Sequence, residues 1–294
     1  MSTTLKHSRP FTSMAPLTWV EIDLKALEHN WLQLKKLATS NMAYNAGIMP
    51  VIKADAYGHG VLPVAQVLSD NGCKFFGVSN VQEGVALREA GFKQRILLFE
   101  STLPEDAEAI IEHKLTPTVC NLDLAHRLDD VAKSQEIPIH IKIDTGMGRL
   151  GIAEEETISF VKEIQNKFKS LRLEGIYTHF PLADTDRTFT FAQMRRFRDI
   201  VFALENHFIS FTFVHAGNSM GLGNYKSELL NLGRPGLMLY GLYPSEQLKT
   251  KIHLNPVMSV KSRIIFVKTI KKAMGLVMAI RLKQKRIRLL QSFL

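Results

Sequence analysis

The sequence predicts an α/β fold, a parallel (β/α)8 barrel of the TIM type, followed by only the start of a C-terminal β-domain. Eight short β-rich segments alternate with seven longer helical patterns over most of the chain. Such alternation is typical of a parallel sheet, and eight repeats are the number that closes a barrel. In addition, chemically reactive side chains follow several of the strands, at the ends where barrel enzymes gather their functional groups.

The predicted strands are short runs rich in β-branched and aromatic residues. They are IMPVIKA (48–54), FFGVS (75–79), RILLF (95–99), TPTVC (116–120), IHIKID (139–144), LEGIYTH (173–179), FTFVHA (211–216) and the stretch around LGRPGLMLYG (232–241). The amphipathic segments between them predict helices that begin near Val61, Val81, Pro104, Leu122, Glu154, Phe189 and Gly221.

The pattern changes after the barrel, which we place at residues 18–253. From Leu254, NPVMSVKSRIIFVKTI predicts an antiparallel strand with no helix behind it, so residues 254–272 are interpreted as the start of a β-domain. Residues 273–294, AMGLVMAIRLKQKRIRLLQSFL, have neither turn residues nor alternation and form an aberrant basic tail.

The positive net charge of +9 belongs to that C-terminal part. Of the 37 Lys and Arg residues, 12 follow Glu246, whereas none of the 28 Asp and Glu residues does. The part before it has 25 basic and 28 acidic residues, a net charge of −3. A nucleic-acid or membrane-surface function, which would act through KQKRIR, therefore rests on charge alone, and we expect neither partner.

Composition indicates an ordinary globular protein. At 294 residues and 46% hydrophobic the chain can bury a large core, and no apolar run approaches the ~20 residues of a membrane span. The polar start MSTTLKHSRP lacks a secretory apolar segment, so a cytoplasmic protein is expected. Cys73 and Cys120 form no CxxC pair and no metal-spaced cluster; we expect buried thiols, no disulfide and no metal.

The segment VIKADAYGHG (51–60) places Lys53 at a strand end, with Tyr57 four residues on. A lysine near a tyrosine is in itself compatible with a surface ion pair. The string, however, resembles the attachment motif for pyridoxal 5'-phosphate (PLP) in alanine racemases, usually spelled KANAYGHG; Asp55 replaces the common Asn. The resemblance implies that Lys53 forms the Schiff base with PLP and is a catalytic base, and that Tyr57 helps to bind the phosphate.

A second segment, IKIDTGMGRLGI (141–152), also resembles that family nearly letter for letter. The resemblance implies that Arg149 contacts the phenolic oxygen of PLP. It also implies that Lys142 is a candidate for carbamylation, which would make it an anion that orients Arg149. The alternative is a structural lysine paired with Asp144.

The remaining motifs complete the resemblance. In YTHF (177–180), His179 is implied to hydrogen-bond the arginine that faces the cofactor, and in GRPGLMLYG (233–241) that arginine is Arg234, which meets the pyridine nitrogen. Arginine holds that nitrogen unprotonated, because it cannot release its proton near neutrality. HAGNS (215–219) resembles the phosphate-binding turn, which implies further cofactor contacts by Asn218, the Ser219 hydroxyl and the backbone N–H groups of Gly236 and Leu237.

The resemblance extends from TWVEIDLKALEHN near Trp19 to about Ile270. It implies a homodimeric isomerase that interconverts L- and D-alanine, supplying D-alanine for peptidoglycan, by a two-base mechanism on opposite faces of the substrate. The second base is a tyrosine in an S-Y-G motif of the family's β-domain, from the partner subunit. Here no tyrosine follows Tyr243, so the homodimer is in question and impaired activity is expected.

A change of reading frame would account for the tail. Residues 273–294, back-translated with synonymous codons and read two bases on, can give DGVSYGYTFKTKTYTVIAVIP, which resembles the family's continuation. We therefore hypothesise a frameshift near Lys272 or Ala273.

One alternative is a PLP-binding carrier without racemase activity, because single-domain barrels of related fold bind PLP. GMGRLGI argues against it, since Lys142 and Arg149 resemble parts of a racemase. Other amino-acid racemases and decarboxylases share the barrel, so alanine specificity rests on the family spelling of these motifs.

Overall fold

The computed structural model describes residues 16–43, 46–133, 135–270 and 288–292. The chain divides into two compact units, Asp23–Val257 and a smaller one made of Met1–Ile22 with Met258–Leu294. They are described separately below.

The larger unit contains a parallel sheet. Its strands lie in the order β3 (Phe75–Val78), β4 (Arg95–Ser101), β5 (Thr116–Val119), β6 (Ile137–Asp144), β8 (Leu171–Tyr177) and β9 (Phe213–His215). The short β7 (Ile152–Ala153) pairs with β6 outside this order. A separate parallel pair is formed by β2 (Gly47–Ile48) and β10 (Leu232–Gly233). All these pairings are parallel, as the alternating pattern predicts.

Backbone hydrogen bonds join both edges of the six-stranded sheet to the β2–β10 pair and so close the barrel. On one side, Ile52 N–H donates to Gly77 O at 2.9 Å and Gly77 N–H to Pro50 O at 3.0 Å, which joins the continuation of β2 to β3. On the other side, Asn231 N–H donates to Val214 O at 3.0 Å and joins β9 to β10. Eight parallel strands thus form the predicted barrel, one for each predicted segment.

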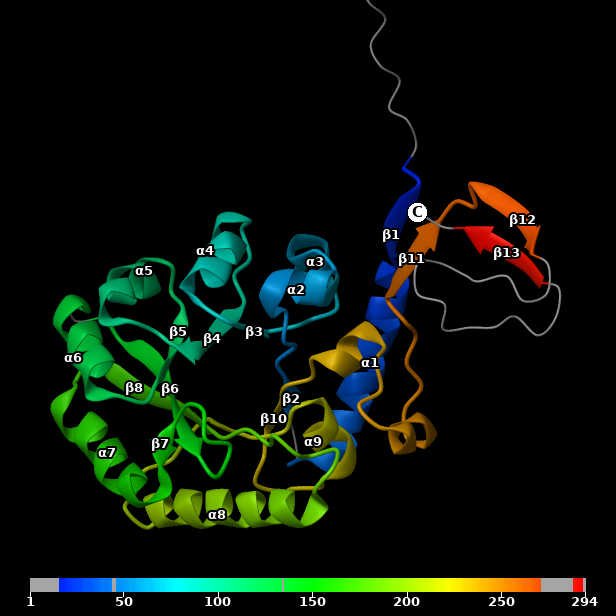
Figure 1. Cartoon of the computed structure of the whole chain (residues 1–294). Coiled ribbons are helices and arrows are strands. Elements are labelled where there is room, and N and C mark those ends of the chain that lie inside the picture. Colours follow the sequence, from blue (N-terminus) through cyan, green and yellow to red (C-terminus); the bar gives the residue numbers. More distant parts are fainter. Residues whose placement is uncertain (1–15, 44–45, 134, 271–287, 293–294) are drawn as a thin grey trace, which may run out of the picture. The chain divides into compact units, whose positions relative to one another are not determined.

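Helices lie around the outside of these strands (Figure 1). They are α1 (Leu24–Asn41), α3 (Val61–Asp70), α4 (Val81–Glu89), α5 (Ala107–Glu112) behind the 3-10 turn η1 (Pro104–Asp106), α6 (Leu122–Val131), α7 (Glu154–Lys167), α8 (Arg187–Glu205) and α9 (Ser219–Asn224). Each predicted helix is present, and its start lies within two residues of the prediction. Asn80, Asn121 and Asp186 cap α4, α6 and α8 with side-chain oxygens, which explains why those helices begin there.

Part of the barrel interior is filled by Met49, Phe75, Leu97 and Leu232, from β3, β4, β10 and the chain just after β2. Phe99 and Phe213 pack against this cluster. Since one part of the barrel is plugged by apolar side chains, the polar groups concentrate elsewhere. No helix within the described ranges is long and apolar enough to cross a membrane.

The smaller unit is antiparallel. Its strand β1 (Thr18–Ile22) pairs with β11 (Met258–Ser262), and β12 (Phe266–Ile270) pairs with β13 (Arg288–Ser292). This pairing groups residues 18–22 with the C-terminal segment, whereas the sequence analysis assigned residues 18–22 to the barrel. It also gives five residues of the basic tail a strand, where no pattern was expected; 271–287 and 293–294 lie outside the described residues. The division into functional domains stays a prediction.

The wall beside the barrel's polar end includes the 3-10 turn η2 (Leu237–Tyr240), with η3 (Glu246–Thr250) further along the chain. Gly241 ends η2 with φ of +84°, and its N–H donates to Met238 O at 3.2 Å. A Cβ at Gly241 would overlap the Asn255 carbonyl. Because Asn255 O is itself held by the buried Asn30 side chain at 2.8 Å, that carbonyl cannot move away easily.

We expect Gly241→Ala to destabilise the barrel by more than the backbone conformation alone explains. Gly72 has a similar φ of +79° with open space around it, so Gly72→Ala is the matched control. The control should lose about 1–2 kcal/mol for a left-handed alanine. Gly241→Ala should lose about 1–3 kcal/mol more for the overlap. Urea unfolding measures both; equal losses would contradict the steric argument.

Candidate functional site

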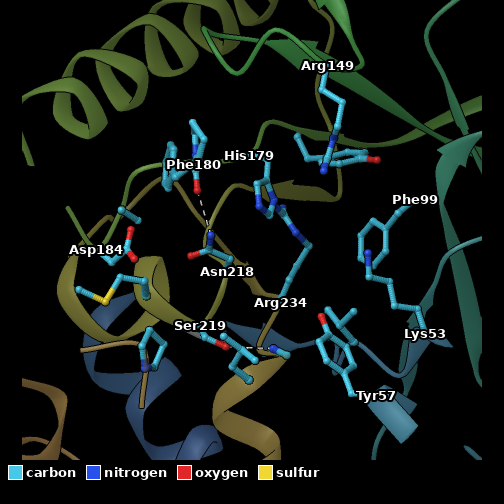
Figure 2. Close-up of a pocket in the computed structure, with 18 of the residues that line it drawn as sticks. Lys53, Tyr57, Phe99, Arg149, His179, Phe180, Asp184, Asn218, Ser219 and Arg234 are labelled. Atoms are coloured by element: carbon cyan, nitrogen blue, oxygen red, sulfur yellow. Dashed lines mark hydrogen bonds between the residues drawn. The ribbon is translucent and has the colours of Figure 1, made fainter. Parts of the chain in front are cut away.

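A cavity of about 310 Å³ lies where side chains from several strand ends converge. All the residues that the sequence predicts for the site line this cavity, and Figure 2 shows most of them as sticks. They are Lys53, Tyr57, Lys142, Arg149, His179, Asn218, Ser219, Arg234, Gly236 and Leu237. Residues from distant parts of the chain thus converge on one cavity.

Lys53 reaches the cavity from an unusual backbone turn. The segment α2 (Lys53–Gly58) is a left-handed turn, in which Ala54 to Tyr57 have φ values of +51° to +55°. Left-handed conformations cost about 1–2 kcal/mol per non-glycine residue. Surrounding contacts must therefore hold the turn, and the sequence analysis predicted only its position.

Two carboxylates hold this turn. Glu83 of α4 accepts the N–H of Ala54 and the N–H of Ser79, both at 2.7 Å, and so fastens the turn to the end of β3. Asp55 accepts the N–H of Val61 at 2.6 Å, at the start of α3. An asparagine oxygen could accept the same hydrogen bond, which explains why Asp55 can stand in place of the family's usual Asn.

Arg234 is buried at the cavity wall, and its guanidinium has four hydrogen-bond acceptors, including His179 Nδ1 as the resemblance implies. It donates to His215 Nδ1 at 2.7 Å, to Thr178 O at 2.7 Å and to Ala216 O at 3.1 Å. Burial lowers the pKa of Arg234 to about 10, so it remains a cation at neutral pH. His179 Nδ1 lies 3.4 Å from the same guanidinium. Burial, followed by the Arg234 charge, lowers the pKa of His179 to about 3 and leaves the imidazole neutral.

Lys142 and Arg149 bring two more cations to the cavity. Asp144 does not pair with Lys142 within the described chain; it accepts the backbone N–H groups of Gly146, Met147 and Arg149 at 2.7–3.1 Å. These bonds fix the loop that carries Arg149. Burial, followed by the charges of Arg149 and Arg234, lowers the pKa of Lys142 to about 8. The alternative of a Lys142–Asp144 ion pair is therefore not observed.

A small polar cradle lies on the opposite wall. The Ser219 hydroxyl accepts the N–H groups of Gly236 at 3.0 Å and Met238 at 3.2 Å, which leaves its own proton free to donate. A Cβ at Gly236 would come within 2.8 Å of Tyr57 Oη, so only glycine leaves this cradle open. Burial raises the pKa of Tyr57, which keeps its hydroxyl protonated and able to donate.

Asn218 braces the cradle from behind. Its side-chain oxygen accepts the Gly221 N–H at 2.9 Å and caps α9, while its amide donates to Phe180 O at 3.0 Å. Leu237 lies on the cavity wall at the first position of η2. N–H groups in the first turn of a helix have no partner within it.

The cavity is strongly positive. Four cations line it, Lys53, Lys142, Arg149 and Arg234, against the single carboxylate of Asp184. Within the described ranges, neither the Lys53 amine nor the Arg149 guanidinium has a hydrogen-bond or ion-pair partner. Such unpaired cations favour an anionic ligand.

Sequence reasoning missed Tyr177 as part of the site. Its hydroxyl hydrogen-bonds Thr118 Oγ1 at 2.8 Å, and its ring stacks on His215 at 4.6 Å and lies 5.1 Å from the Arg234 guanidinium carbon. The motif YTHF contained this residue, but nothing in its local pattern showed that it would support Arg234. Cys73 is buried and Cys120 half-buried, both as free thiols. Among the described residues no cluster could hold a metal ion.

Comparison with known proteins shows similarity to alanine racemases over most of the chain. The family model described as the alanine racemase N-terminal domain matches residues 22–244. The alanine racemase of Halothermothrix orenii is 39% identical over 262 residues, which cover 88% of this chain and 68% of that protein. The solved alanine racemase of Clostridium difficile 630 superposes with a TM-score of 0.82 at 31% identity, covering 96% of this chain and 73% of that one.

A further solved relative is the alanine racemase of Bacillus anthracis with bound L-Ala-P, with a TM-score of 0.80 at 28% identity, covering 96% of this chain and 73% of that one. The fold and the cluster of site residues define a barrel enzyme of the amino-acid racemase class. The chain belongs to the alanine racemase family, a PLP-dependent family. These relatives favour a racemase over the alternative of a PLP carrier.

The lowered pKa of Lys142 predicts a pH-dependent stability. The unfolded chain keeps a lysine pKa of 10.5, so between about pH 8 and that value the unfolded state binds more protons than the folded one. The free energy of unfolding should therefore rise with pH across this window, by at most about 3 kcal/mol. Urea unfolding in carbon-dioxide-free buffer should show this contribution as a difference: stability should rise more, or fall less, with pH in the unmodified chain than in Lys142→Met. The buried Cys73 thiol, whose pKa is raised to about 12, lowers stability above about pH 9 in both chains.

Lys169→Met, which removes an exposed lysine, is the matched control and should leave the rise unchanged. A parallel pH dependence in the unmodified chain and in Lys142→Met would contradict the assignment.

Proposed function

We propose that this cavity binds PLP and that the chain acts on the α-carbon of alanine through Lys53. The observation that carries this proposal is the convergence of an unpaired lysine, a buried arginine and a hydroxyl-and-amide cradle on one cavity. In this assignment Lys53 holds the cofactor covalently. Tyr57, Ser219, Asn218, Gly236 and Leu237 hold its phosphate, and Arg149 contacts its phenolic oxygen. The L-Ala-P bound to the Bacillus anthracis relative supports an alanine-like substrate.

The residues present fit such a group. Its phosphate requires donors and positive charge, and the cradle offers the hydroxyls of Tyr57 and Ser219 beside a glycine whose missing Cβ keeps the space open. The cavity volume of about 310 Å³ lies at the small end of the range for ligand sites. The one acidic lining residue, Asp184, adds little repulsion against an anion.

When bound, PLP supplies an electron sink that makes the α-proton of an amino acid acidic. The Lys53 amine would take or return that proton on one face of the α-carbon. Arg234 would lie at the ring nitrogen, and because arginine donates but cannot accept, it would keep that nitrogen without a proton. This would favour proton exchange over other reactions at the α-carbon.

The charge on Lys142 determines whether it repels or attracts the Arg149 guanidinium. As a cation it repels Arg149, which is one cause of its lowered pKa. A pKa of about 8 leaves about a tenth of the amine neutral at pH 7. A neutral amine reacts with carbon dioxide, and the carbamate would replace a repulsive charge with an attractive one beside Arg149. We therefore assign Lys142 as the carbamylated lysine.

Racemisation needs a second base on the other face, which the family supplies by a tyrosine from the partner subunit of a homodimer. No tyrosine follows Tyr243 in these 294 residues. A polypeptide of these residues can therefore hold the cofactor and one base, but it lacks the second. We propose that its racemase activity is impaired for this reason, in keeping with the frameshift hypothesis.

Borohydride reduction in the presence of PLP should place the pyridoxyl group on Lys53 and not on Lys142, the other lysine of the cavity, because the turn that carries Lys53 also brings Tyr57 to the proposed phosphate cradle. Peptide mapping by mass spectrometry locates the group. Lys142→Met should keep the label, whereas Lys53→Arg should lose it. Label found only on another lysine would refute the site assignment.

The 294-residue chain loaded with PLP should convert L-alanine to D-alanine slowly. Loss of one general base typically lowers a rate by ~10²–10⁴-fold. The comparison is the same gene with its reading frame restored near residue 272. Deuterium exchange at the α-carbon should survive for one enantiomer and disappear in Lys53→Ala. Equal turnover of the two gene products would refute the need for the second base.

A further inference from the structure

A line of buried polar side chains runs from Arg234 away from the cavity. Arg234 donates to His215 Nδ1 at 2.7 Å, and His215 Nε2 lies 2.8 Å from His140 Nδ1. His140 Nε2 in turn lies 3.6 Å from Glu174 Oε2. Both histidines are fully buried, and Glu174 is 1% exposed. None of these three residues lines the cavity.

Because Arg234 is a donor, it determines which nitrogen of His215, and then of His140, carries the proton. Arginine can only donate, so His215 Nδ1 must be the acceptor and the proton of His215 must sit on Nε2. That proton is donated to His140 Nδ1, so the proton of His140 must sit on its Nε2. This N–H faces Glu174 Oε2 at 3.6 Å, just beyond hydrogen-bond distance, and within the described ranges neither of these two buried atoms has another hydrogen-bond partner. The carboxylate, which can only accept, is therefore the acceptor available to His140. The chain of three side chains is thus consistent with one tautomer of each histidine.

Both imidazoles are neutral. Burial, followed by the Arg234 charge, lowers the pKa of His215 well below its ordinary value. Burial also lowers the pKa of His140, against the opposing effect of Glu174. Burial would raise the pKa of Glu174, but His140, Arg172 and Arg95 together hold it below its ordinary value. The far end is therefore an anion, held at 3.0 Å by Arg172 and at 3.5 Å by Arg95.

The barrel makes space for this line. His140 of β6 lies opposite Gly175 of β8, and a Cβ at Gly175 would come within 2.5 Å of the His140 ring. The His140 ring also packs against Phe75 and Phe213, members of the apolar interior. Two neutral imidazoles and a carboxylate are costly to bury in such apolar surroundings unless polar partners satisfy them.

We propose that His140 and Glu174 are positioning residues of the cofactor site, which fix His215 in the tautomer that accepts from Arg234. Without an acceptor beyond it, His140 could turn its proton toward His215, and His215 would then present an N–H to the guanidinium. Two facing donors would repel, and Arg234 would lose one of the four acceptors that orient it. Only the use of Arg234 as a cofactor contact rests on the proposed function.

Histidine tautomers can be measured directly by nitrogen-15 NMR of the imidazole groups in the full chain, without cofactor. His215 should carry its proton on Nε2 from pH 6 to pH 9, with the signal assigned by its loss in His215→Gln. A proton on Nδ1 of His215 would overturn the proposal, whatever the chain does with PLP. Failure of PLP binding with the tautomer as expected would instead overturn only the proposed function.

Variants of Glu174 distinguish the effect of its oxygen as a hydrogen-bond acceptor from the effect of its negative charge. Glu174→Gln keeps an oxygen acceptor and should keep the tautomer, whereas Glu174→Met removes the acceptor at similar volume. Glu174→Met should give a mixed tautomer population and weaken PLP binding by about three- to tenfold, the effect of one hydrogen bond. Glu136→Gln is the matched control, because Glu136 also pairs with Arg172 at 2.5 Å but is exposed and lies outside the line.

Loss of the tautomer in Glu174→Gln, or an unchanged tautomer in folded Glu174→Met, would overturn the proposal. Should Glu174→Met not fold, the pair His140→Asn and His140→Leu replaces it. The asparagine keeps an acceptor for His215 and should preserve its Nε2 proton, and the leucine should not. Equal His215 spectra in these two variants would equally overturn the proposal.

Discussion

The buried Arg234 guanidinium is the constraint around which this site is built. A cation that is 3% exposed in a barrel interior requires acceptors for its N–H groups, because an unpaired buried charge is strongly destabilising. The acceptors are the carbonyls of Thr178 and Ala216 and ring nitrogens of His215 and His179. These residues end β8 and β9, so Arg234, which follows β10, also ties three neighbouring strand ends together.

A second constraint acts on the other side of the cavity, where Lys53 leaves the barrel through a left-handed turn. The strain of that turn is tolerated because Glu83 and Asp55 accept its N–H groups or those of its neighbours. The turn brings Tyr57 Oη beside Gly236, so the cradle depends on contacts between segments about 180 residues apart along the chain. Closure of the barrel between β2 and β10 is what makes them neighbours.

The sequence predicted those parts that local pattern encodes. Strands followed from short β-rich runs and helix starts from amphipathic segments, which the structure shows to be capped by residues such as Asn80 and Asn121. Site residues followed from motifs that resemble a family. It did not predict the left-handed turn, because Ala and Tyr carry no local signal for positive φ. The support of Lys53 by Glu83 and the pairing of β1 with β11 depend on contacts between distant segments, and no periodicity reports such contacts.

Cofactor binding and racemisation have different structural requirements in this chain. Every group that we assign to the cofactor, from Lys53 to Leu237, lies within the Asp23–Val257 unit. The proposed cofactor contacts therefore all come from the barrel. In the proposed mechanism, exchange on both faces of the α-carbon also needs a second base, and Tyr177 is not free for that role because its hydroxyl is hydrogen-bonded to Thr118. The barrel thus carries the residues that we propose for cofactor binding and for one of the two bases.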